Sequence, residues 1–222
     1  CARVSNALTR PLTHAAAAAD FVAQAGAYTD AADALMRRID QEIVVELGPP
    51  PVAYSVVALG SFAARELAPG SDLDFAILTA AASEATRAYF RAYVQRLAER
   101  AAHRERGDDS SAVSVHICDR VSPCGIMGDA LIDTPSGMAG RSAGVTRDFT
   151  QLTRRDQDFL QAALSGTREV VRRGDGSLHE EFLAQRRADL LRNGAAAHAR
   201  MVGRLTRSLR DPFDISKAAT ED

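Results

Sequence analysis

The sequence has no tryptophan, few other aromatic residues and only three cysteines among its 222 residues. Three cysteines cannot build the network of paired disulfides that holds small secreted domains together. No stretch of 18 or more consecutive apolar residues is present, so the sequence predicts no membrane-spanning helix. We therefore expect a globular protein of the reducing cytoplasm that has no membrane partner.

A surplus of basic charge is also missing, because 27 Lys and Arg face 29 Asp and Glu and the formal net charge is −2. This balance does not favour a protein that binds long nucleic acids through its overall charge, although a local basic patch can do so on a neutral protein. What the sequence does have is 46% apolar and 25% charged residues. These proportions are typical of soluble globular domains, and the length suits one large domain or two small ones.

The apolar pattern predicts a mixed α and β protein. Residues 1–50 carry an Ala-rich helix over about 13–24, which Gly26 is expected to end, and a second helix over about 30–47. The central region alternates strands and helices, with strands over 52–59, 72–78 and 112–118 and helices over 61–67 and 84–102. Residues 120–146 are rich in Gly, Ser and Pro and read as a long functional loop or a domain boundary. The remaining chain is expected to be helical over about 153–164, 178–193 and 195–209.

Two aspartates form an Asp-x-Asp pattern, Asp72 and Asp74, on the second predicted strand. Side chains two apart on a strand project from the same face, so both carboxylates should point the same way. Leu73, Phe75 and Ile77 occupy the opposite face and should pack into a core. Mg²⁺ commonly takes one or two carboxylates together with phosphate oxygens. An isolated Asp-x-Asp is most often a solvated turn, so the meaning of this pair depends on its surroundings.

A Gly-Ser turn, Gly60 and Ser61, ends the preceding strand. Backbone N–H groups at the start of a helix lack partners within the helix and can meet a phosphate. A glycine lets the backbone come close to that phosphate. A phosphate-binding turn facing a carboxylate pair predicts metal-assisted phosphoryl or nucleotidyl transfer.

Residues 60–74, GSFAARELAPGSDLD, resemble the signature of the nucleotidyltransferase superfamily of the DNA polymerase β type. The segment is most similar to the PII uridylyltransferases, the glutamine-synthetase adenylyltransferases and their uncharacterised nucleotidyltransferase relatives. Its Arg65-Glu66-Leu67 triplet matches the adenylyltransferase form. The uridylyltransferase form has its arginine one place earlier, where this chain has Ala64. Residues 122–127, SPCGIM, resemble a Cys-Pro-Gly-Gly-Val-Met loop of the uncharacterised relatives.

The resemblance implies an α+β fold, with a small mixed sheet of the polymerase-β type, flanking helices and a helical C-terminal region. Residues 1–50 would pack on a catalytic domain over 51–146, and residues 147–222, with PFDISK at 212–217, would form the helical region. The His-Asp hydrolase motif of the full uridylyltransferases is not seen. The reverse reaction is therefore not indicated.

The resemblance also implies roles for individual residues. Asp72 and Asp74 would bind Mg²⁺ or Mn²⁺, and Gly60 and Ser61 would hold the phosphates of a nucleoside triphosphate. A third acid normally completes such sites as a base or second-metal ligand. Asp119 is our candidate, although period-2 alternation puts it on an apolar face and a strand-ending cap is an equal alternative. Asp109, in the preceding loop, is a further candidate. His116 points the other way, with Ser114 and Cys118, and that side could itself be the polar face of the strand.

Two more residues of the signature have alternative interpretations. Arg65 would neutralise triphosphate charge, since a guanidinium suits phosphate, or it would be an ordinary exposed helix arginine. Ser71 is expected to stabilise the turn before Asp72 through a side-chain-to-backbone hydrogen bond, and also to touch phosphate.

Other polar clusters favour ordinary structural explanations. His116, Cys118 and Cys124 lack a recognisable zinc spacing. A Cys–His nucleophile pair is conceivable there, but semi-buried residues without a chemical role are the simpler explanation. The stripe of Arg200, Arg204 and Arg207 on the last predicted helix would be a solvated face, or would contact an acidic partner or nucleic-acid phosphates.

Three functions follow from these patterns. The first is a Mg²⁺-dependent enzyme that moves a nucleoside monophosphate from ATP, UTP or another triphosphate to an acceptor hydroxyl, most simply on a protein. The second is a toxin-type nucleotidyltransferase domain of a larger secreted protein, which would act on RNA or protein in a target-cell cytoplasm. It is motivated by the start at Cys1 and the abrupt end after Asp222, which suggest a fragment or processed product. The third is a non-catalytic nucleotide-sensing module that lacks the third acid.

Overall fold

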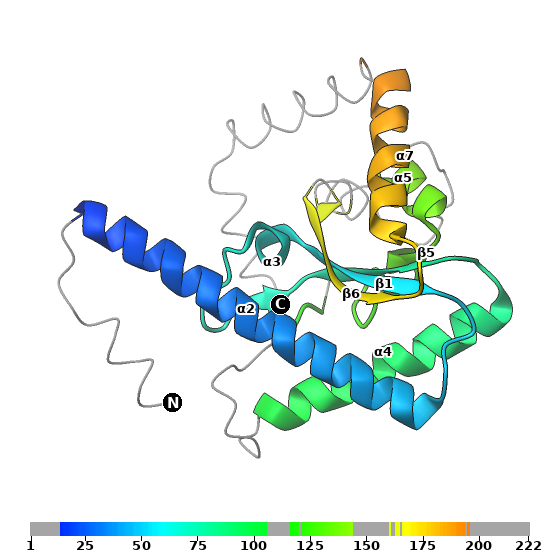
Figure 1. Ribbon diagram of the computed structural model, residues 1–222, viewed down its shortest axis with the longest axis horizontal. Coiled ribbons are helices and arrows are strands. Elements are labelled where there is room, and N and C mark those ends of the chain that lie inside the picture. Colours follow the sequence, from blue (N-terminus) through cyan, green and yellow to red (C-terminus); the bar gives the residue numbers. More distant parts are fainter. Residues whose placement is uncertain are drawn as a thin grey trace.

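A four-stranded mixed sheet forms the centre of the computed structural model (Figure 1). The structure describes residues 14–105, 116–119, 121–143, 160, 163–164, 166–193 and 195. The strand order is β5-β3-β1-β6, and a separate two-stranded sheet is made by β2 and β4. The strands are β1 (Tyr54–Leu59), β2 (Asp72–Leu73), β3 (Phe75–Thr79), β4 (His116–Ile117), β5 (Ile132–Asp133) and β6 (Thr167–Arg173).

The central strand β1 runs antiparallel to both of its neighbours, β3 and β6, while β5 runs parallel to β3. The register between β1 and β6 shifts between Val56 and Val57, which marks a bulge in β6. All six residues of β1 and all five of β3 are buried. A strand buried on both faces reads as an almost continuous apolar run, which is the pattern of both strands. The small mixed sheet and the α+β class predicted from the sequence are confirmed.

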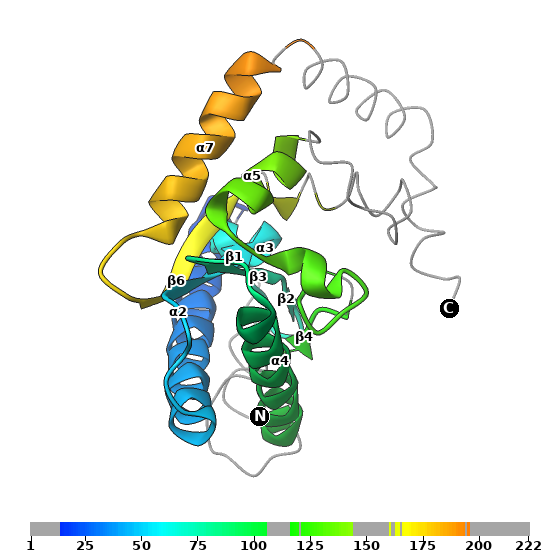
Figure 2. The same cartoon turned by 90° about the vertical axis from the view of Figure 1, so that its right-hand side faces the viewer.

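Helices α2 (His14–Leu47) and α4 (Glu84–Glu105) cover one face of the sheet. They lie side by side below it in Figure 2. Their apolar residues meet alternate residues of β1 and β3, among them Val56 and Ile77, in one continuous core. Leu73, Phe75 and Ile77 are fully buried in that core, as the period-2 pattern predicts.

Helices α5 (Pro135–Ala143) and α7 (Leu178–Arg192) cover the opposite face (Figure 2). A second core forms there from Val57, Leu59 and Leu78 of the sheet and from Met138 and Phe182 of these helices. The predicted helix over 178–193 agrees closely with α7, which begins at an N-cap serine, Ser177, whose side chain accepts a hydrogen bond from Glu180 N.

A buried carboxylate, that of Asp40, joins four elements around the first core. It is 1% exposed and accepts hydrogen bonds from the hydroxyls of Tyr54 at 2.5 Å and Tyr93 at 2.8 Å. The guanidinium of Arg173 donates to its other oxygen at 2.6 Å and 2.9 Å. This network connects α2 with β1, α4 and β6, so the two outer helices and the edge strand share one polar anchor.

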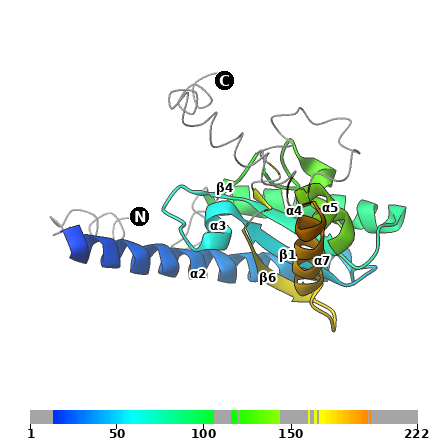
Figure 3. The same cartoon turned by 90° about the horizontal axis from the view of Figure 1, so that it is seen from above.

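The N-terminal helices predicted over 13–24 and 30–47 are in fact one helix, α2. The prediction that Gly26 ends the first of them is therefore wrong. Glycine inside a helix costs only about 1 kcal/mol relative to alanine, which tertiary contacts readily offset. Here the guanidinium of Arg65 lies against Gly26 and donates to its carbonyl oxygen at 3.4 Å. Figure 3 shows the N-terminal half of α2 extending beyond the sheet.

Two segments contain structure that the sequence patterns did not predict. Residues 120–146, expected to be irregular, include a 3₁₀ helix, η2 (Gly128–Leu131), followed by β5 and α5. Strand β6 lies within the region expected to be helical and pairs with β1 along its whole length. The C-terminal region therefore contributes an edge strand to the sheet.

The remaining predicted elements agree in type and differ in extent. Helix α3 (Gly60–Ala64) is shorter than the expected helix over 61–67, and the expected strand over 72–78 is divided into β2 and β3. Most of the helix over 153–164, most of the helix over 195–209 and most of the strand over 112–118 lie outside the described residues, as do Asp109 and the Arg200 stripe. Among the helices of the described ranges, none combines the length and apolarity needed to cross a bilayer.

Candidate active site

The Asp-x-Asp pair lies where the chain passes from one sheet to the other. Asp72 belongs to β2, and Asp74 stands between β2 and β3. The carbonyl oxygen of Asp74 accepts a hydrogen bond from Leu59 N at 2.9 Å, which extends the β1–β3 ladder to the last residue of β1. The backbone therefore holds Asp74 directly beside the turn that follows β1.

Gly60 begins this turn with a positive φ of 53°. A Cβ at this position would lie 2.8 Å from Oδ2 of Asp74, which is closer than side chains pack. Only glycine allows both the left-handed backbone and the close approach of the carboxylate. The structure thus brings together the two halves of the signature, which are 14 residues apart in sequence.

Burial and a neighbouring negative charge both act on the carboxyl group of Asp74. Burial raises the pKa of the Asp74 carboxyl, the hydrogen bond from Cys118 lowers it, and the negative charge of Asp72 raises it again. The net shift is upward, so the ionised carboxylate is incompletely compensated by the protein. Asp72 itself is exposed, which leaves the pair open to solvent on that side.

Helix α3 carries Ser61 on its exposed surface and buries Phe62 completely. Arg168 of β6 supports this helix, because its Nη2 donates to the carbonyl oxygen of Phe62 at 3.0 Å. The same guanidinium pairs with the buried Asp33 of α2 at 2.6 Å and lies 5.3 Å from the centroid of the Phe62 ring. The turn bearing Gly60 and Ser61 is therefore attached to both α2 and β6.

Arg65 caps α3 in the left-handed conformation, with φ 63°. Its guanidinium forms an ion pair with Asp30 of α2 at 2.7 Å, and both side chains are largely exposed. In this structure Arg65 thus joins α3 to α2. Its assignment as a triphosphate contact stays a prediction.

Ser71 forms the turn expected of it. Its hydroxyl accepts a hydrogen bond from Ala68 N at 3.0 Å, and its own N–H donates to Ala68 O at 2.9 Å. This pair of bonds closes the loop between Leu67 and Asp72. Contact of Ser71 with phosphate stays a prediction.

Asp119 lies two residues after β4 and is exposed. Its carbonyl oxygen accepts a hydrogen bond from Ile126 N at 2.8 Å, which closes the loop over 119–126. Strand β4 pairs in parallel with β2, and this register puts Cys118, one residue earlier, beside Asp74. The third-acid assignment of Asp119 stays a prediction.

The donor set suits a hard divalent cation. The two aspartates supply carboxylate oxygens, and Gly60 leaves room for the Asp74 carboxylate at the turn. Within the described ranges, no group of three or more His, Cys, Asp or Glu residues is arranged to hold a metal ion. Water and the phosphate oxygens of a substrate would complete the coordination of Mg²⁺, as they commonly do.

Two residues near the site escape prediction from the sequence. The sequence indicates Cys118 only as part of a zinc or nucleophile pair, and Arg168 lies on a strand that was not predicted. For Cys118 the sequence contains a usable signal, which is the alternating pattern of residues 112–118. If that strand pairs in parallel with the strand of Asp72, its alternate residues His116 and Cys118 project from the same side as the two aspartates. No local pattern identifies Arg168, because its partners Asp33 and Phe62 are more than 100 residues away.

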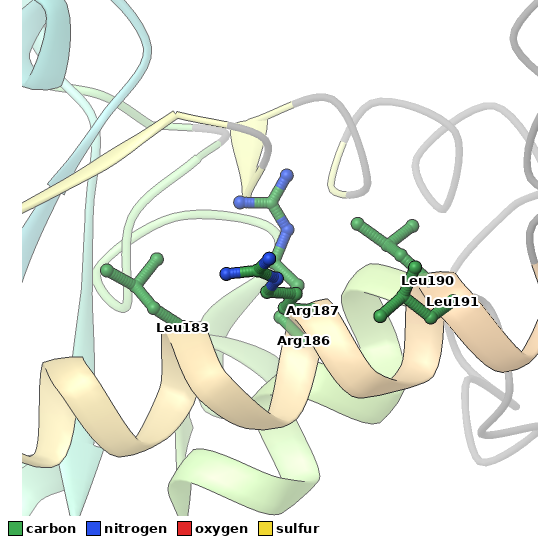
Figure 4. A pocket seen from close by; sticks show the side chains of 5 residues that line it. All are labelled: Leu183, Arg186, Arg187, Leu190 and Leu191. Carbon is green, nitrogen blue, oxygen red and sulfur yellow. The ribbon is translucent and has the colours of Figure 1, made fainter.

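A hollow of about 290 Å³ lies along α7, lined by Leu183, Arg186, Arg187, Leu190 and Leu191 (Figure 4). Figure 4 shows the two arginines rising from the helix between the leucines. Burial lowers the pKa of Arg186 from its usual value. None of the residues predicted for the active site lines this hollow.

Replacing Gly60 with alanine tests the contact between the turn and Asp74. The left-handed φ should lower stability by roughly 1–2 kcal/mol, and the new methyl group should also displace the Asp74 carboxylate. Gly70→Ala is the matched control, because Gly70 has φ 84° and a methyl group added there would meet nothing within 4 Å. We expect similar losses of melting temperature in both variants, but weaker Mn²⁺ binding, measured by electron paramagnetic resonance, only in Gly60→Ala. Equal Mn²⁺ affinities in the two variants would contradict this prediction.

Comparison with known families agrees with this geometry. Residues 4–104, slightly less than half of the chain, match the family described as "Putative nucleotidyltransferase DUF294". The matched segment includes α2, β1, α3 and the Asp-x-Asp pair. No curated protein matches the chain. The family match, together with the signature and the mixed sheet, supports the assignment of this chain to the nucleotidyltransferase superfamily and to the enzymes of that class.

Proposed function

We propose that the protein is a Mg²⁺-dependent enzyme that transfers a nucleoside monophosphate from a nucleoside triphosphate to an acceptor hydroxyl and releases pyrophosphate. The observation that carries this proposal is the position of Oδ2 of Asp74, 2.8 Å from where a Cβ of Gly60 would be. A carboxylate pair and a glycine turn in contact provide a metal-binding group and a phosphate-binding backbone in one place.

Each residue has a distinct task in this proposal. Asp72 and Asp74 hold Mg²⁺ or Mn²⁺, which supplies charge stabilisation for the phosphates when bound. Gly60 lets the backbone approach the β- and γ-phosphates, and the exposed Ser61 offers a hydroxyl and an N–H to them. The support of α3 by Arg168 keeps this turn in position, and preorganised donors of this kind stabilise developing charge most effectively.

The reaction is a displacement at the α-phosphorus. The acceptor oxygen forms a bond to this phosphorus while the bond to the bridging α–β oxygen breaks, and pyrophosphate leaves with the electron pair. The acceptor hydroxyl loses its proton to a base, for which Asp119 is our candidate. Its exposed position at the start of the loop over 119–126 is compatible with an acceptor that arrives from solvent.

The acceptor we propose is a protein side-chain hydroxyl, because the signature is most similar to enzymes that modify regulatory proteins. ATP and UTP are the two donors that this similarity suggests. We propose the cytoplasm as the site of action, either of the producing cell or of a target cell. A nucleic-acid acceptor is the alternative outcome of the same assay.

The test uses the four common ribonucleoside triphosphates, each labelled at the α- or the γ-phosphate, with Mg²⁺ and a cell lysate as the source of acceptors. We expect a macromolecule to be labelled by one α-labelled triphosphate and not by its γ-labelled form, and EDTA to abolish labelling. Protease and ribonuclease treatment distinguish a protein from an RNA acceptor. Labelling by the γ-phosphate, or no labelling by any triphosphate, would overturn the proposal.

A second function, a non-catalytic nucleotide-sensing module, is favoured by one observation. The residue that the β4 register puts beside Asp74 is Cys118, which is not an acid. Calorimetry that detects triphosphate binding in the presence of Mg²⁺, with no label transfer, would select this function.

A further inference from the structure

Cys118 lies at the site that the Asp-x-Asp pair defines. Strand β4 pairs in parallel with β2, with Asp72 opposite His116 and Leu73 opposite Ile117. The N–H of Cys118 donates to the carbonyl oxygen of Leu73 at 3.2 Å. This slanted bond continues the parallel ladder by one step and places Cys118 opposite Asp74, with both side chains on the same side.

The Cys118 thiol is held by its surroundings. The residue is 9% exposed, and its Sγ accepts a hydrogen bond from Val121 N at 3.2 Å. The hydroxyl of Ser122 donates to the carbonyl oxygen of Cys118. Val121 in turn accepts a hydrogen bond from Phe75 N at 3.2 Å, so the same loop contacts the residue that follows Asp74. Val121 therefore contacts both the sulfur of Cys118 and the backbone of the residue after Asp74.

The thiol and the Asp74 carboxylate form a side-chain hydrogen bond. An ionised carboxylate only accepts, so the S–H is the donor. A thiol is a weak donor, and this bond orients the carboxylate while leaving most of its negative charge available. Mg²⁺ and Mn²⁺ prefer carboxylate, carbonyl and water oxygens, whereas a thiol is a soft ligand, so the role we consider for Cys118 is not that of a ligand. It acts through Asp74.

We propose that Cys118 is a positioning residue for metal binding, whose S–H holds the carboxylate of Asp74 in the orientation that binds the cation together with Asp72. This inference rests on the proposed function, because it assumes a metal at the aspartate pair. Hydrogen-bond partners of metal ligands contribute strongly to affinity, and their removal costs about 10–100-fold. Because a thiol is a weak hydrogen-bond donor, we expect the loss of metal affinity to be near the lower end of this range.

The experiment measures the dissociation constant of Mn²⁺ by electron paramagnetic resonance of the free ion, without a catalytic assay. Cys118→Ala and Cys118→Val both remove the donor, and the valine variant retains an apolar side chain of similar size. We expect both to bind Mn²⁺ about tenfold more weakly than the wild type. Cys118→Ser retains a donor and should recover most of the affinity. Cys124→Ala is the matched control, because the thiol of Cys124 donates to Val94 O at 3.5 Å instead, and its affinity should not change.

The outcomes separate this inference from the proposed function. If Cys118→Ala binds Mn²⁺ as the wild type does while Asp74→Asn does not bind it, the positioning inference is overturned and the metal site stands. If Cys118→Ser is as weak as Cys118→Ala and both lose melting temperature, or if neither donor-free variant folds, Cys118 has a packing role and the inference is overturned. A wild-type protein that binds no Mn²⁺ would overturn both the inference and the metal site.

Discussion

Replacing Asp74 with asparagine is expected to reduce nucleotidyl transfer on the order of 10³-fold and to abolish Mn²⁺ binding. A metal ion supplies several kcal/mol of charge stabilisation in the transition state of phosphoryl chemistry, and about 4 kcal/mol corresponds to this factor. Asparagine has nearly the same shape but lacks the charge that holds the cation. Asp72→Asn should behave similarly, because its carboxylate is the other half of the pair. The measurement is the initial rate of label transfer from the α-labelled triphosphate.

Stability distinguishes this functional effect from misfolding. The net upward shift of the Asp74 pKa means that its ionised form lowers the stability of the folded protein at neutral pH. Asp74→Asn should therefore unfold at the same or a higher urea concentration than the wild type. Asp129→Asn is the matched control, since this exposed aspartate pairs with Arg91 at the surface. Retention of activity within tenfold of the wild type in Asp74→Asn would show that Asp74 does not bind the metal.

The largest expected effect on stability comes from Asp40→Ala. This change removes the common acceptor of the Tyr54 and Tyr93 hydroxyls and the ionic partner of Arg173. Breaking a buried ion pair by removing one partner costs about 3–5 kcal/mol, and each buried hydroxyl left without a partner adds to the loss. Arg173 is 35% exposed, so water compensates part of its charge and the lower end of this range is expected. Urea unfolding gives the free energy directly.

Two further variants make the Asp40 result interpretable. Asp40→Asn retains the shape and one acceptor oxygen, so it should lose less stability than Asp40→Ala and remain measurable if the alanine variant does not fold. Glu42→Ala lies on the same helix and removes a surface ion pair with Arg100 at 3.3 Å. Exposed pairs contribute little, so this control should unfold close to the wild type. A loss from Asp40→Ala no greater than that from Glu42→Ala would contradict the role of Asp40 as an anchor.

The sequence was sufficient to predict those features that depend on residues close to one another in the chain. The signature from Gly60 to Asp74 predicted that the turn faces the carboxylate pair, which the structure shows, and the apolar pattern predicted α4 and α7. The metal and phosphate at this site stay a prediction. Ser71 was expected to close its turn because serine before an exposed bend commonly bonds to nearby backbone.

The remaining features depend on partners distant in sequence. Strand β6 reads as TREVVRR, in which four charged residues suggest an exposed helix. In the fold, Arg168 pairs with Asp33, Glu169 accepts from Ser55, and Arg173 pairs with Asp40. The charged side chains of this strand find their partners only after the chain has folded. The local sequence pattern therefore did not indicate a strand of the sheet. Gly26 misled the helix prediction for the same reason, since Arg65 contacts it from α3.

The origin of β6 also determines when the protein can fold during synthesis. Ser55 and Glu169, which bond across the β1–β6 pair, are 114 residues apart. Until the ribosome has released β6, β1 has one open edge, and an unpaired apolar strand is a template for pairing with other chains. Loop closure over such a distance slows folding, because its entropy is lost before the contact is gained. The matched segment over 4–104 thus contains the signature but not β6, the edge strand that pairs with β1. We therefore expect the nascent chain to be most vulnerable to aggregation in the interval before β6 emerges from the ribosome.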